Sequence, residues 1–190
     1  NYELVKDIYS QIEPFKHRRA GKLSGGMKQK LALSCALIHR PSVLLLDEPT
    51  TGVDAVSRKE FWEMLKNLKK QGITILVSTP YMDEAGLCDR IALIQNAKIL
   101  SLNTPTGVIK EFKNPLLAAR SSQMLKLLNI LNMAPGVENA YPFGEYHHVV
   151  MKKEAEEKAF REFILQEQPD TIIVSVEPNI EDCFMALMKN

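Results

Sequence analysis

The sequence has few cysteines, no excess of charge and no long hydrophobic run. Its three cysteines are far apart and form no CxxC pair, so we interpret them as small buried residues and expect neither a disulfide framework nor a zinc site. Lys and Arg number 24 against 23 Asp and Glu, and this balance gives no electrostatic case for nucleic acid as the main partner. No apolar run approaches the ~18–20 residues that a membrane-spanning helix needs. The composition, which is 45% hydrophobic, indicates a globular protein.

Helices and strands are predicted to alternate over the first 112 residues. Ser24 is placed to cap a helix that runs to His39. The apolar run 43–46 predicts a strand buried on both faces, and it is followed by a helix over 55–71 and a strand over 73–78. Shorter elements are predicted at 2–12, 81–88 and 104–112 (helices) and at 91–94 and 98–102 (strands). This alternation indicates an α/β fold with a mostly parallel sheet.

A change of pattern after residue 113 marks the best candidate domain boundary. Strands are predicted at 116–119, 137–143, 146–151 and 171–176, and helices at 122–132, 155–166 and 180–188. The order βαββαβ favours a small ferredoxin-like α+β domain. We therefore divide the chain into a helical segment over 1–40, an α/β core over 41–113 and the α+β domain over 114–190.

Two short stretches carry the chemistry. Ser24, Gly25 and Gly26 precede a helix, and Asp47 and Glu48 follow the apolar strand. Taken singly, the first stretch is compatible with a simple cap and turn, and the second with a solvated strand end.

Together, in this order and spacing, the two stretches resemble the signature sequence, Walker B strand and D-loop of the nucleotide-binding domain of ATP-binding cassette (ABC) proteins. The similarity covers most of residues 1–112, and the tail over 180–184 resembles the terminal helix of export-type members. The resemblance implies part of a P-loop NTPase core with a helical signature subdomain, and it implies ATP and Mg²⁺ as ligands.

The resemblance assigns a role to each stretch. The signature, Ser24 to Met27, would bind the γ-phosphate of an ATP held mainly by a second nucleotide-binding domain, because a helix N-terminus attracts anions through its free N–H groups. Met27 stands where the family often has Gln. Asp47 would hold the Mg²⁺ shell, through water, and Glu48 would polarise the attacking water. Asp54 matches the D-loop acid that touches the other subunit, and it is equally placed to cap the following helix.

Two features depart from the family pattern. The phosphate-cradling motif GxxxxGK[ST] does not occur in these residues. We expect this sequence to be a C-terminal portion of a longer parent that carries the loop upstream, and to bind MgATP weakly or not at all by itself. Pro80 occupies the position where the family usually has a His that contacts the γ-phosphate, and proline offers neither a side-chain hydrogen bond nor an N–H group. Either another residue substitutes, or hydrolysis at this site is slow.

The function implied by the resemblance is that of an ATP-binding and ATP-hydrolysing subunit of an ABC transporter of the exporter type. Its partners would be a second nucleotide-binding domain, in a homodimer, a heterodimer or the same chain, and membrane-spanning subunits. It would lie in the cytoplasm at the inner face of the membrane. The alternatives are a soluble ABC-type ATPase without a transporter, and an ATP-binding regulatory module with little hydrolysis.

Overall fold

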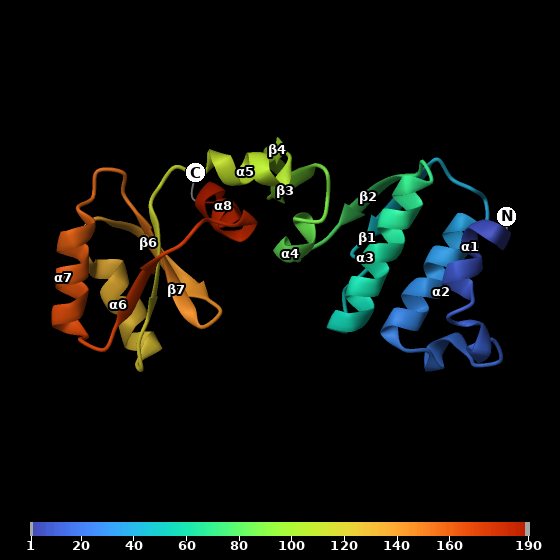
Figure 1. The fold of residues 1–190 in the computed structure, drawn as a ribbon, viewed down its shortest axis with the longest axis horizontal. Helices are drawn as coiled ribbons and strands as arrows, with labels where there is room; N and C mark the ends of the chain where they lie inside the picture. The colour runs from blue at the N-terminus through green and yellow to red at the C-terminus, as the bar shows by residue number, and fades with distance from the viewer. Residues whose placement is uncertain (1, 189–190) are drawn as a thin grey trace. The chain divides into compact units, whose positions relative to one another are not determined.

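The computed structural model describes residues 2–188, which form two compact units, one up to Leu87 and one from Cys88 onward (Figure 1). Each unit is described by itself. Among the described residues, no helix combines the length and the apolar character that crossing a lipid bilayer requires. The division at 40 and 113 that the sequence suggests stays a prediction, and its second boundary falls inside the second unit.

The first unit contains a strand, helix, strand motif preceded by helices. Its elements are α1 (Tyr2–Tyr9), η1 (Glu13–Phe15), η2 (Ala20–Lys22), α2 (Gly25–Leu37), β1 (Val43–Asp47), α3 (Ala55–Lys70), β2 (Thr74–Ser78) and α4 (Met82–Ala85). β1 and β2 pair in parallel, with Asp47 opposite Ser78, so the two strands end side by side. The parallel pairing predicted for this motif is present.

Local sequence signals set the limits of the two main helices. The Ser24 side chain accepts a hydrogen bond from the backbone N–H of Met27 and caps α2, as predicted. Asp54 caps α3 in the same way through Ser57. At the other end of α3, Gly72 adopts a positive φ of 90°, which a glycine tolerates at low cost, and the chain turns into β2. The buried face of α3 consists of Phe61, Trp62, Leu65 and Leu68.

Two predictions of burial are wrong. β1 is not buried on both faces, because Val43 is 52% exposed and Leu45 is 70% exposed while Leu44 is buried. Within the described residues nothing covers the face that carries Val43 and Leu45, so the apolar run has one covered face rather than two. Cys35 is exposed on α2, whose buried positions lie on the other side of the helix, and only Cys183 is buried among the three free cysteines.

The second unit begins with a hairpin and a helix. The elements are β3 (Ile91–Gln95), β4 (Lys98–Asn103) and α5 (Pro105–Glu111). β3 and β4 pair antiparallel, so the expectation of a mostly parallel sheet holds only for β1 and β2. The reason is the very short connection, since parallel neighbours need a crossover of a dozen residues or more.

The ferredoxin-like domain predicted from the βαββαβ order is present. Its elements are β5 (Leu116–Arg120), α6 (Met124–Met133), β6 (Val137–Phe143), β7 (Tyr146–Met151), α7 (Glu157–Glu167) and β8 (Ile172–Ser175), followed by α8 (Ile180–Leu187). The strand order is β6-β7-β5-β8 and all neighbours pair antiparallel. Leu127 and Leu131 of α6 and Phe160 of α7 pack on one face of this sheet.

The other face of the sheet is joined to α8 by a buried polar group. Asp182 of α8 is fully buried and accepts hydrogen bonds from the Tyr141 hydroxyl (2.6 Å) and the His148 ring (Nδ1, 2.6 Å). Its other oxygen accepts the backbone N–H of Asn179 (2.9 Å), which completes a capping box. Burial alone raises the pKa of Asp182, but the bonds from His148, Tyr141 and Asn179 outweigh it and hold that pKa below its ordinary value.

Candidate functional site

Two acidic residues stand at the carboxyl end of β1. Asp47 and Glu48 are both exposed to solvent, so both carboxylates can contact water. The hydroxyl of Ser78, at the matching end of β2, donates to Asp47 Oδ1 and accepts the backbone N–H of Glu48 (3.0 Å). The same N–H also approaches the Ser78 carbonyl oxygen (3.1 Å). Ser78 therefore ties both acids to the neighbouring strand.

Glu48 has an unusual backbone conformation. Its φ of +43° lies in the left-handed region, which costs a residue other than glycine about 1–3 kcal/mol. Such a conformation persists only where the surroundings hold it, and it often occurs at functional sites. The Thr51 hydroxyl donates to Glu48 Oε2 (3.1 Å) and restrains the side chain as well. No local sequence pattern predicts this conformation at Glu48.

The glycines at the start of α2 permit a close approach, and the approaching group is the chain's own loop. A Cβ on Gly25 would lie 2.9 Å from the backbone oxygen of Gly52, and one on Gly26 would lie 2.7 Å from the Ser57 hydroxyl. Ser24 itself is exposed. The two glycines therefore let the N-terminus of α2 pack against the loop that follows the acid pair and against the first turn of α3.

The predicted D-loop acid is confirmed in its capping role. Asp54 is exposed and its Oδ1 accepts the backbone N–H of Ser57 (3.0 Å). The hydrogen bonds from the Ser57 backbone and side chain lower the pKa of Asp54 below its ordinary value. Its contact with a second subunit stays a prediction.

Pro80 lies just beyond β2, two residues after Ser78, and it is exposed. It is therefore close in sequence to the group that holds the acid pair. Pro80 offers no polar side chain and no N–H group, so it brings no hydrogen-bond donor to this edge.

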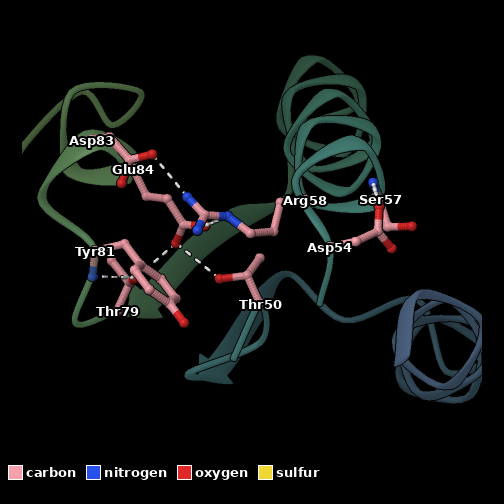
Figure 2. A network of polar contacts seen from close by, with 8 residues as sticks. All are labelled: Thr50, Asp54, Ser57, Arg58, Thr79, Tyr81, Asp83 and Glu84. Atoms are coloured by element: carbon pink, nitrogen blue, oxygen red, sulfur yellow. Dashed lines mark hydrogen bonds and ion pairs between the residues drawn. The ribbon is translucent and has the colours of Figure 1, made fainter. Parts of the chain in front are cut away.

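A polar network that the sequence did not reveal joins the segments that follow β1 and β2 (Figure 2). Its centre is Glu84 of α4, which is 2% exposed. Glu84 Oε2 accepts from the hydroxyls of Thr50 (2.9 Å) and Thr79 (2.6 Å). Glu84 Oε1 lies 3.2 Å from Nε of Arg58, whose guanidinium also stacks on the ring of Tyr81 at 4.3 Å. The carboxylate thus links residues from four separate segments of the first unit.

Sequence reasoning missed this network for a physical reason. Glu84 lies in the stretch 81–85 that matched the family, but nothing in its spacing marks it as buried. Thr50 precedes it by 34 residues and approaches it only because β1 and β2 end side by side.

The acid pair is compatible with Mg²⁺ of the kind that accompanies nucleotides. Mg²⁺ is usually bound by one or two carboxylates together with waters and phosphate oxygens. Asp47 is an exposed carboxylate of this type, with a serine hydroxyl beside it. Across the described residues no group of three or more His, Cys, Asp or Glu side chains could hold a metal ion by itself. A metal at this site would therefore need further ligands from a nucleotide and water.

Comparison with known proteins points to one family. A family model described as ABC transporter matches residues 5–51. The probable multidrug ABC transporter ATP-binding protein YbhF of Escherichia coli K12 is 37% identical over 182 residues, which cover 95% of this chain and 31% of that protein. The Nod factor export ATP-binding protein I of Neorhizobium galegae is 32% identical over 183 residues, covering 94% of this chain and 50% of that protein.

A solved structure supports the same conclusion. The cbiO1 protein of Clostridium perfringens, part of the ABC transporter complex cbiONQ, superposes with a TM-score of 0.51 at 30% identity, covering 57% of this chain and 45% of that one. The chain thus spans from 31% to 50% of the length of these relatives. The α/β fold, the signature and Walker B motifs and these similarities agree, and the chain belongs to the ATP-binding cassette (ABC) family.

Proposed function

We propose that these residues form the signature and Walker B half of an ATP-hydrolysing subunit of an ABC transporter that works in export. The observation that carries the proposal is the pair Asp47 and Glu48, which is exposed at the end of β1 and held there by Ser78. The names of the relatives support the direction of transport, since they include a multidrug transporter protein and a Nod factor export protein.

In this proposal Glu48 and Asp47 have different roles in hydrolysis. Glu48 accepts a hydrogen bond from the attacking water and takes up its proton, as a general base positioned by Thr51 and by its own backbone. Asp47 holds the hydration shell of Mg²⁺, and its hydrogen bond with Ser78 fixes the direction of its carboxylate. When bound, Mg²⁺ neutralises charge on the phosphate oxygens.

The start of α2 serves a second nucleotide-binding domain. The first N–H groups of a helix have no partner inside the helix, and together with the helix dipole they favour an anion. Ser24 is exposed at this end of a 13-residue helix with no acidic residue in its first turn. We assign Ser24, Gly25, Gly26 and Met27 to the γ-phosphate of ATP bound mainly by the other domain. Asp54 would contact that domain as well.

The phosphate-cradling loop must come from residues outside this sequence, because the motif does not occur in it. We therefore expect the 190-residue chain alone to bind MgATP weakly or not at all. Isothermal titration calorimetry of the chain with MgATP measures this directly. A micromolar dissociation constant would show that these residues hold the nucleotide by themselves and would refute the proposed division of the site.

Export requires membrane-spanning partners, and the proposed place of the subunit is the inner face of the membrane. Copurification of the intact subunit with a polytopic membrane protein supports the transporter. Association with ribosomes or DNA instead would support the soluble ATPase. The balanced charge of the sequence gives no electrostatic reason to expect such binding.

Pro80 favours a second candidate, an ATP-binding module with slow hydrolysis at its own site. In that case Ser24 and its neighbours would still complete the site of a partner domain. We expect Pro80→His in the intact ATPase to raise ATP turnover about ten-fold or more, since one added hydrogen bond in the transition state has an effect of this order. Phosphate release at saturating MgATP measures it, and an unchanged rate would mean that another residue already supplies the contact.

A further inference from the structure

The buried carboxylate of Glu84 holds together the two loops that leave the parallel strands (Figure 2). Thr50 follows β1 and is 1% exposed, and Thr79 follows β2 directly. Both hydroxyls donate to the same oxygen, Glu84 Oε2, at 2.9 and 2.6 Å. The Thr79 hydroxyl also accepts the backbone N–H of Tyr81 (3.1 Å), so the turn into α4 belongs to the same arrangement.

Each threonine is close in sequence to one side of the contact between Ser78 and the acid pair. Thr50 is two residues after Glu48, and its carbonyl oxygen accepts the N–H of Val53 in the same turn (3.2 Å). Thr79 directly follows Ser78 in the chain, and the Ser78 hydroxyl contacts both Asp47 and Glu48. A shift of Thr50 would therefore displace Glu48, and a shift of Thr79 would displace Ser78, so either would disturb the hydrogen bond between the Glu48 N–H and the Ser78 hydroxyl.

Arg58 makes the burial of Glu84 tolerable. A buried carboxylate is strongly unfavourable unless it is paired and hydrogen-bonded. Arg58 of α3 supplies the positive charge at 3.2 Å from Oε1, and its terminal nitrogen pairs with exposed Asp83 at 2.8 Å. Its stacking on Tyr81 restrains the guanidinium further. The network is therefore anchored to α3 as well as to both strands.

Glu48 needs such an anchor because its φ of +43° is unfavourable for a residue with a side chain. We propose that Glu84 is a positioning residue, which through the hydroxyls of Thr50 and Thr79 keeps the strand ends together and so holds Glu48 in the conformation that presents its carboxylate. The part of this inference that concerns catalysis rests on the proposed function. The part that concerns the conformation of Glu48 does not.

The test removes one hydroxyl at a time and uses two readouts. The first is hydrogen exchange of the Glu48 backbone N–H in the 190-residue chain, which needs no nucleotide. The second is kcat and KM for ATP in the intact ATPase. Thr79→Val is expected to speed exchange at Glu48 and to lower kcat, each about ten-fold or more, because a hydrogen bond to a charged group is lost. KM should change less than about two-fold, since Thr79 is not a proposed nucleotide contact.

Conservative variants separate positioning from a general loss of stability. Thr79→Ser keeps the hydroxyl and should restore both readouts. Thr74→Val, on the exposed face at the start of the same strand, is the matched control and should change neither. Exchange at the Leu65 amide inside α3 reports the stability of the unit. Thr50→Val and Thr50→Ser repeat the comparison on the other strand if Thr79→Val unfolds the unit.

Exchange at Glu48 that is the same in Thr79→Val as in Thr74→Val would overturn the inference, as would a serine variant that is as impaired as the valine variant. Failure of the proposed function has a different signature. In that case Glu48→Gln would leave turnover unchanged, whereas the exchange rates would still report whether Glu84 holds the strand ends.

Discussion

Replacing Glu48 by glutamine is expected to lower ATP turnover by the intact ATPase about 10²- to 10⁴-fold, the usual contribution of a general base. Glutamine has the same shape and can still accept the hydrogen bond from Thr51, but it cannot take up a proton. The backbone contact between the Glu48 N–H and Ser78 does not involve the side chain. Binding of MgATP should therefore persist while the chemical step slows.

The control for this variant is Glu63→Gln. Glu63 is an exposed glutamate of α3 that pairs with Lys66, so the change removes one charge of the same kind from the same unit without touching the acid pair. Its turnover should equal that of the unchanged protein. A loss of less than about ten-fold in Glu48→Gln, or an equal loss in both variants, would mean that Glu48 is not the base.

Replacing Asp182 by alanine is expected to lower the stability of the second unit by about 3–5 kcal/mol, because removing one member of a buried polar pair leaves its partners without an acceptor. Asp182 is fully buried, and the Tyr141 hydroxyl, the His148 ring and the Asn179 N–H all donate to it. Burial together with the hydrogen bond to Asp182 raises the pKa of Tyr141, so its hydroxyl stays protonated and needs this acceptor.

Hydrogen exchange of the backbone amides in β5 and β7 measures this loss, since these central strands open only when the sheet does. Glu181→Ala is the control, because Glu181 is the exposed neighbour in the same first turn of α8. Its removal should cost less than about 1 kcal/mol, the size of a helix-dipole effect. Equal losses in the two variants would show that Asp182 contributes only through its negative charge at the start of α8.

Much of the fold could be predicted from the sequence because local signals determine it. Ser24 and Asp54 have the side chains that cap helices, and both cap the helices expected of them. Gly144 allows the positive φ of the turn between β6 and β7, where a hairpin was expected. The βαββαβ order then leads to the ferredoxin-like sheet.

What could not be predicted depends on contacts between distant segments. The apolar run of β1 indicated burial on both faces, but burial is decided by what covers a strand, and Leu45 is exposed. Nothing in the sequence around His148 points to Asp182, which lies 34 residues later in the chain and accepts a hydrogen bond from the His148 ring. The sequence did not show that Gly25 lies against the backbone of Gly52, where a Cβ would be only 2.9 Å from the carbonyl oxygen.

The most direct test of the central claim is to identify the nucleotide that the intact ATPase carrying Glu48→Gln holds after incubation with MgATP, beside the Glu63→Gln control. If Glu48 activates the attacking water, the variant should retain ATP on a time scale on which the control has converted it to ADP and phosphate. Conversion at the same rate in both proteins would contradict the account, because the acid pair at the end of β1 would then play no part in hydrolysis.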